Sequence, residues 1–183
     1  MSDTLMTIIA IFAAVIIMFI FPLMWTANSQ EEISQTTIQT LVSNFVNTIA
    51  SKGKLTRTDY EDFYQKLHAT GNTFDIEIEI QVLDDNPGKK TTISSPNLIG
   101  ENIYYSIFTS TLLYSEDGIY GSKGEEEYLL KKGDYVIVNV KNTNITLASQ
   151  LKNFLYKIIG NNTHTIAASA TALIINNGTR GSI

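Results

Sequence analysis

An uncharged apolar run near the N-terminus constrains this chain more than any other feature. Residues 5–25 contain no Asp, Glu, Lys or Arg. A helix of this length, at about 1.5 Å per residue, covers roughly 30 Å, the hydrocarbon thickness of a bilayer. The run lacks the polar stripe of a soluble core helix, and Trp25 closes it where an aromatic ring is favoured, at the lipid–water boundary. Residues 1–29 are therefore predicted to be a transmembrane segment.

Two fates of this segment remain open. Ala27 and Ser29 are small residues that a signal peptidase accepts. However, Asp3 is the only charge before the run, and the run exceeds the about 7–15 apolar residues of a signal peptide, so we expect retention. No Lys or Arg precedes Lys52, so positive charge does not orient the span. The very short leading segment predicts a single-pass cell-membrane protein with its N-terminus inside and its C-terminal domain extracytoplasmic.

The composition excludes some partners of the remaining chain. Subtracting the span leaves about 150 residues, enough for one compact domain with its own core. The 13 basic and 18 acidic residues give a formal net charge of −5 and form no basic patch, so we expect no nucleic-acid partner. The absence of cysteine is compatible with an exported bacterial domain that does not rely on disulfides.

An amphipathic helix is predicted over residues 30–53, ended by Gly53. No Pro/Gly/Ser-rich linker separates it from the span, so we expect the two to form one stalk (residues 1–53). Pro22 should kink the stalk because it removes one helical hydrogen bond; two helices joined by a polar hinge are the alternative. The apolar face of the second helix consists of Ile38, Leu41, Val42, Phe45 and Ile49.

Residues 54–183 are predicted to form an α+β domain. Thr58 and Glu61 have the spacing of a capping box at the start of a short helix. Residues 74–82 alternate apolar and polar side chains without exception, which predicts a half-buried antiparallel strand with an acidic outer face.

The middle of the domain has a sequence pattern that allows more than one secondary structure. Residues 104–112 carry apolar side chains at helical spacing, although their β-branched and aromatic content also allows a strand. Residues 115–127 are typical of an exposed loop. We expect a helix followed by that loop.

The last third contains four predicted elements. A short strand within "EYLL" leads into a turn at 132–134 and a strand at 135–142. A helix covers 147–158, and a further alternating strand covers 166–174. One face of this last strand is small, which lets a helix approach closely, and the stalk is the expected partner. Its small residues are Ala168, Ala170 and Ala172.

Two stretches carry a family resemblance. "TGNTFDIEIE" and "KKGDYVIVNVKNTNITLASQLKNFLYKIIGNNTHTIAASA" resemble small single-span proteins of clostridial-type bacteria, akin to TadE-like minor pilins of tight-adherence pili. The likeness covers most of the chain outside residues 91–127. It implies a pilin-like α+β fold, with the long N-terminal helix packed on a small antiparallel sheet. It also implies a minor pilin or pseudopilin of a pilus, secretion or conjugation apparatus. The front of the chain lacks the Gly and Glu of a prepilin-peptidase site.

The expected partners are the lipid bilayer and other subunits, in a homo- or hetero-oligomer. Ala10, Ala13 and Ala14 provide a small-residue strip on which equivalent helices pack, with Pro22 and Trp25 as further packing positions in the span.

No chemical site is expected. His68 and His164 have no second ligand at metal spacing, and Glu77 and Glu79 belong to a solvated strand face. We therefore expect no enzyme activity, no cofactor or metal, and no small-molecule substrate. The alternative function is a single-span receptor or adaptor that binds a protein or cell-wall partner, which the nine tyrosines favour.

Overall fold

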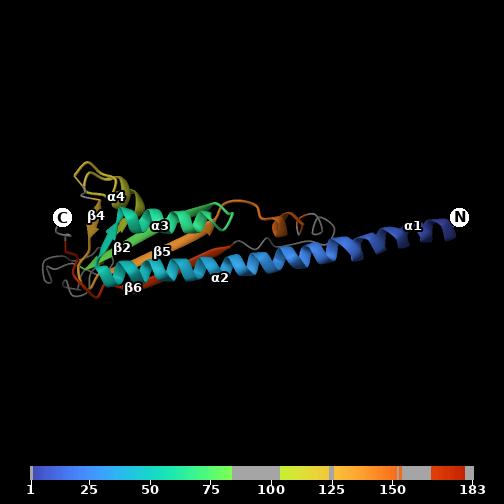
Figure 1. The fold of residues 1–183 in the computed structure, drawn as a ribbon, viewed down its shortest axis with the longest axis horizontal. Coiled ribbons are helices and arrows are strands. Elements are labelled where there is room, and N and C mark those ends of the chain that lie inside the picture. The colour runs from blue at the N-terminus through green and yellow to red at the C-terminus, as the bar shows by residue number, and fades with distance from the viewer. Residues whose placement is uncertain (1, 84–103, 124–125, 152, 154–165, 180–183) are drawn as a thin grey trace, which may run out of the picture.

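The chain begins with one uninterrupted helical rod. Helix α1 (Ser2–Val15), a π-helical segment η1 (Ile16–Ile20) and helix α2 (Phe21–Lys52) follow one another directly. In the computed structural model (Figure 1) the rod extends well beyond a domain of helices and strands that lies along its C-terminal part. The fold class is therefore α+β, as predicted. The structure describes residues 2–83, 104–123, 126–151, 153 and 166–179.

The π-helical segment explains how the rod continues past Pro22. Proline has no backbone N–H to donate, so an ordinary α-helical ladder would lack one bond at this point. Here the backbone N–H of Phe21 donates to the carbonyl of Ile16, five residues back. A single π turn therefore lies immediately before Pro22, and the chain stays helical where a hinge was the alternative.

The main sheet is antiparallel and has four strands in the order β3-β2-β5-β6. In the long central pair, Ile76 lies opposite Val140 and Ile80 opposite Val136. A separate two-stranded sheet pairs β1 with β4. The strands are β1 (Lys54–Thr56), β2 (Phe74–Leu83), β3 (Tyr104–Phe108), β4 (Glu127–Leu129), β5 (Tyr135–Asn142) and β6 (Ala167–Leu173).

The predicted alternation along the central strands is confirmed. Ile78 and Val138 are fully buried, whereas Asp75 and Glu77 on the opposite face are exposed. The buried face packs with α2, with α3 (Arg57–His68) and with α4 (Thr109–Tyr114) into one core. The helices contribute to that core Ile38, Val42, Phe45, Val46, Ile49, Ala50, Phe63, Leu67, Leu112 and Leu113.

The start of α3 corrects one prediction. Its N-cap is Thr56, whose side chain accepts a hydrogen bond from the backbone N–H of Asp59. Thr58 lies inside the helix, so the capping box that its spacing with Glu61 predicted is wrong. Thr56 has extended backbone dihedrals and also ends β1, a strand too short to carry an alternating pattern.

Residues 104–112 are a strand followed by a helix, so the expected continuous helix is wrong for its first half. The strand β3 pairs with β2 from Tyr104 opposite Leu83 to Phe108 opposite Glu79. Backbone pairing at this sheet edge prevails over the helical spacing. The expected loop follows: the described residues 115–123 are irregular and mostly exposed, although Ile119 within them is only 1% exposed.

The turn predicted at 132–134 is present, with Gly133 at a φ of 103°, a value that favours glycine.

Beyond β5, residues 147–151 and 153 are helical. At the start of this helix Leu147 is 58% exposed, whereas Ala148 is buried. The rest of the helix predicted over 147–158 lies outside the described residues.

Candidate functional site

The N-terminal half of the rod is an exposed apolar surface. The helix Asp3–Lys52 contains a window of mean hydropathy 2.8 whose residues are 0% buried, long and apolar enough to cross a membrane. Trp25, the last residue of the uncharged run 5–25, is 76% exposed. Such an N-terminal helix is a membrane anchor or a signal sequence by length and composition.

The small-residue strip lies within this surface. Ala10, Ala13 and Ala14 are all exposed, and at about 100° per residue they share one face of α1. Phe12 and Val15 occupy the opposite face and are also exposed. The two faces of α1 therefore differ in side-chain size, and the alanine face is the one that allows a second backbone to approach closely.

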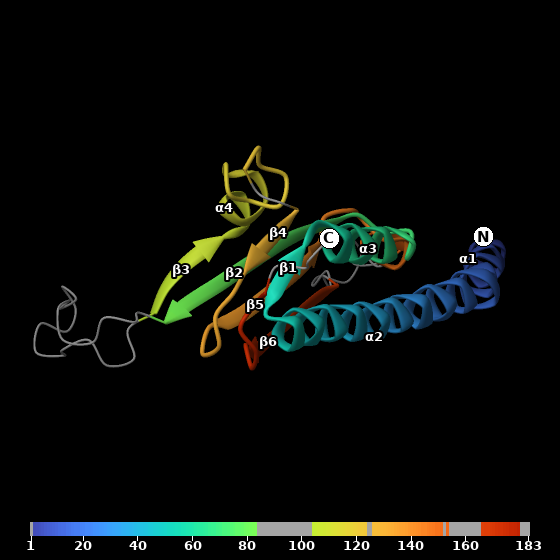
Figure 2. The same ribbon diagram turned by 60° about the vertical axis from the view of Figure 1, so that its left-hand side comes forward.

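The same rod becomes part of the domain core in its second half. Ala27 is its first buried residue, and Ile38, Val42 and Ile49 are 0% exposed. Leu41, predicted on the same face, is half-buried and packs against the core. Figures 1 and 2 show α2 running alongside β6.

Small side chains line the strand at this contact. Ala168 is 5% exposed, and Ala170 and Ala172 are half-buried and pack against the core. All three lie on the face of β6 that packs into the core. Helix α2 contributes side chains to the same core. Because alanine has no atoms beyond Cβ, the helix backbone can lie close to the strand.

Two glutamines of α2 bind the backbone of β6, and the sequence reasoning missed both. Gln35 Nε2 donates to the carbonyl of Ala167 over 2.6 Å, and the N–H of Ala167 donates to Gln35 Oε1 over 3.1 Å. Gln39 Nε2 donates to the carbonyl of Ser169. The signal was available in the sequence: a Gln pair four residues apart borders the apolar face that includes Ile38.

The end of α2 is held by the C-terminal segment of the domain. Gly53, with a φ of 66°, caps the helix in the left-handed conformation. A Cβ at Gly53 would lie 2.2 Å from the carbonyl oxygen of Asn176. The carbonyl of Gly53 also accepts a hydrogen bond from the N–H of Leu130. The rod is therefore fixed to the domain along its second half and at its end.

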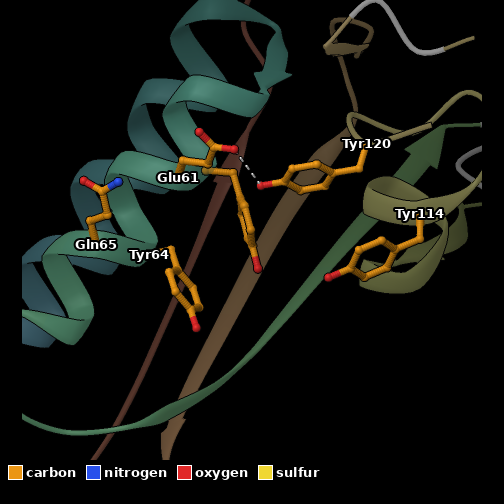
Figure 3. A pocket seen from close by; sticks show the side chains of 6 residues that line it. Glu61, Tyr64, Gln65, Tyr114 and Tyr120 are labelled. Atoms are coloured by element: carbon orange, nitrogen blue, oxygen red, sulfur yellow. Dashed lines mark hydrogen bonds between the residues drawn. The ribbon is translucent and has the colours of Figure 1, made fainter. Parts of the chain in front are cut away.

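A second feature is a cleft of about 340 Å³ between α3 and the segment that contains α4. Figure 3 shows Tyr64 and Gln65 on the α3 side and Tyr114 and Tyr120 on the other. The ring of Tyr120 meets the ring of Tyr60 edge-on, with ring centroids 6.3 Å apart. It lies nearly parallel to the ring of Tyr114, with centroids 6.0 Å apart. We call this the tyrosine cleft; it is lined by Tyr60, Glu61, Tyr64, Gln65, Tyr114 and Tyr120.

A short polar network at one end of the tyrosine cleft joins its two sides through Glu61 and Tyr120 (Figure 3). Glu61 Oε1 accepts hydrogen bonds from Arg57 Nε at 2.9 Å and from the Tyr120 hydroxyl at 3.3 Å. The Arg57 hydrogen bond lowers the pKa of Glu61. The guanidinium also lies 4.9 Å from the centre of the Tyr120 ring. Burial, with a smaller contribution from neighbouring tyrosines, raises the pKa of Tyr60 to about 12.

The residues weighed as chemical candidates lie on separate elements: His68 ends α3, whereas Glu77 and Glu79 lie two residues apart on one face of β2. Glu79 accepts hydrogen bonds from Ser106 and Gln81 on the outer face of the sheet. His68 packs against the ring of Tyr64, 4.2 Å away, and His164 lies outside the described residues. Within the part of the chain that the structure describes, no three His, Cys, Asp or Glu side chains are placed to hold a metal ion.

Other tyrosines of the chain lie outside the tyrosine cleft. Tyr104 packs edge-on against Tyr135 on the sheet, and Tyr105 is 53% exposed on β3. The tyrosine cleft was missed because its walls come from segments about fifty residues apart in the chain.

Comparison of the chain with protein-family models, curated proteins and solved structures finds no match.

Proposed function

We propose that this protein is a membrane-anchored, pilin-like structural subunit, a minor pilin or pseudopilin, of an envelope pilus, secretion or conjugation apparatus. Residues 5–25 hold it in the bilayer with the N-terminus inside. The domain lies outside the membrane and contacts neighbouring subunits.

One observation carries this proposal: a single helix is exposed and apolar in its first half and belongs to the domain core in its second half. A tethered receptor needs only a flexible linker between its anchor and its binding domain. Here, Gln35 and Gln39 bind the edge of β6, and Gly53 is enclosed by the C-terminal segment. Anchor and domain are thereby one rigid unit, so helix packing in an assembly sets the position of every domain.

The alanine strip supplies the assembly contact. Ala10 and Ala14, four residues apart, form the small-xxx-small spacing that brings helix backbones close in a membrane. Because the chain has no cysteine, single-cysteine variants test this contact directly. We expect Ala10→Cys and Ala14→Cys to form disulfide-linked dimers on mild oxidation in native membranes. Phe12→Cys and Val15→Cys, on the opposite face, are the matched controls.

The size of the solubilised assembly completes the test. A structural subunit should yield oligomers larger than a dimer, because its domains add further contacts to the symmetric pairing of the alanine faces. Equal cross-linking of both helix faces, or a strictly monomeric protein in native membranes, contradicts the proposal.

The tyrosine cleft favours a second candidate, a single-span receptor or adaptor. Tyr64 and Tyr114 present 45% and 71% of their surface to solvent beside Glu61 and Gln65, a combination typical of a recognition site. A monomer in membranes that retains ligand binding would support this second candidate over the structural subunit.

A further inference from the structure

We infer that the tyrosine cleft binds a neutral saccharide. This goes beyond the structural role of the stalk, because the cleft lies in the domain, away from the N-terminal end of the rod (Figure 1). Its volume of about 340 Å³ is at the lower end of the range for small-ligand sites, roughly 300–1,000 Å³.

Aromatic rings on both walls offer stacking surfaces. Tyr64 and Tyr114 are 45% and 71% exposed, on opposite sides of the cleft (Figure 3). Between them, Tyr60 and Tyr120 contact each other edge-on and form a continuous aromatic lining. A pyranose ring has one apolar face of C–H groups, which packs on such rings, while its hydroxyls point outward from the ring edge.

The cationic partner of the carboxylate in the cleft belongs to the protein itself. Arg57 donates to Glu61, lies over the ring of Tyr120 and also pairs with Glu126, which does not line the cleft. The carboxylate of Glu61 and the face of Tyr120 that attracts cations are therefore both already next to a guanidinium. A quaternary ammonium ligand would compete with Arg57 for the same groups, whereas a neutral ligand has no such competitor.

The hydrogen-bonding groups require a ligand that both donates and accepts. Glu61 is an acceptor, and Gln65 and the tyrosine hydroxyls both donate and accept. Of the two Glu61 oxygens, Oε1 takes both described bonds, from Arg57 and Tyr120. A proline-rich peptide, the other ligand of aromatic grooves, lacks N–H donors at its prolines and offers mainly acceptors. Saccharide hydroxyls match both kinds of group.

Binding is tested with the full-length protein in phosphatidylglycerol nanodiscs, which contain neither sugar nor choline headgroups. The neutral probes are chitotriose and cellotriose; a ten-residue polyproline peptide and choline are the competing classes. Saturation-transfer NMR detects binding, and titration of ring-labelled tyrosine signals gives Kd. We expect at least one trisaccharide to bind and to perturb tyrosine signals of the cleft.

Two variants and a matched control localise the binding. Tyr64→Ala and Tyr114→Ala remove exposed rings and should each weaken trisaccharide binding by about three- to tenfold. Tyr105→Ala removes a similarly exposed tyrosine on β3 and should leave Kd unchanged. Absence of trisaccharide binding, or equal Kd values for wild type and both cleft variants, overturns the inference. Binding of only polyproline or only choline, lost in the cleft variants, reassigns the cleft to that ligand class and overturns it as well.

Discussion

The ring of Phe63 on α3 stacks on the ring of Phe45 on α2, with centroids 4.1 Å apart and planes only 1° from parallel. Both side chains are almost fully buried. The stack joins the short helix α3 to the rod, and α3 in turn supplies one wall of the tyrosine cleft. This pair therefore links the apolar rod to the proposed binding site.

Removing that ring should destabilise the domain strongly. Phe63→Ala leaves a cavity between α2 and α3 and should lower the free energy of unfolding by about 3–5 kcal/mol. Chemical denaturation of the full chain, followed by near-ultraviolet circular dichroism of the tyrosines, measures the change. The neighbouring Tyr64→Ala truncates an exposed ring and should cost less than about 1 kcal/mol. Similar costs for both variants would mean that α3 does not depend on the stack.

Enlarging the alanine-lined face should separate the rod from the sheet. Ala168→Leu adds volume where the strand faces the core and should cost about 1–3 kcal/mol, equivalent to a fall in Tm of about 2–4 °C per kcal/mol. Thr171→Leu on the exposed face of the same strand is the control and should leave Tm within error. An unchanged Tm for Ala168→Leu would show that the space between α2 and β6 accommodates a leucine side chain without strain.

Loss of Gln35 should expose the edge of β6. In Gln35→Ala, the N–H and carbonyl of Ala167 lose both side-chain partners, at a cost of about 0.5–1.5 kcal/mol. Hydrogen exchange at the Ala167 amide should become faster, and the unprotected edge should increase self-association. Thr36→Ala, whose hydroxyl bonds only within the helix to Glu32, should change neither. Unaltered exchange at Ala167 would argue that water replaces the glutamine without penalty.

Alkaline pH should weaken the domain through Tyr60. Its pKa is raised to about 12 in the folded protein by burial, above the ordinary value near 10. The folded state therefore holds the proton more tightly, and this contribution to stability is complete below about pH 10 and is lost as pH rises towards about 12. The free energy of unfolding, measured between about pH 10 and pH 12, should fall more steeply with pH for the wild type than for Tyr60→Phe. Parallel curves would place the alkaline transition at other groups.

The elements that the sequence predicted well are those whose signal is local. The uncharged run before Trp25 and the strict alternation around Ile78 follow from the geometry of helices and strands, which depends only on neighbouring residues. The apolar spacing from Ile38 to Ile49 likewise predicted which face of α2 is buried. Gly53 and Gly133 ended or turned the chain where their conformational freedom was needed.

The elements that the sequence missed depend on a partner distant in the chain. Tyr104–Phe108 is a strand because β2 offers it an edge, and Thr56 caps α3 because β1 ends there after pairing with β4. The position of Gln35 beside the apolar face of α2 indicates a contact with the domain, but nothing local identifies Ala167, far away in the sequence, as its partner.

The sequence by itself thus determined the apolar rod, the amphipathic helix and the central strands, because covalent geometry converts residue spacing into helix and strand faces. The sequence also named the rod as the partner of the alanine-lined strand. Only the tertiary structure decided that Gln35 and Gln39 bind the edge of β6 and that Tyr64 and Tyr114 face one cleft (Figure 3). These contacts join segments whose separation along the chain carries no periodic signal, so they arise only when the whole core packs.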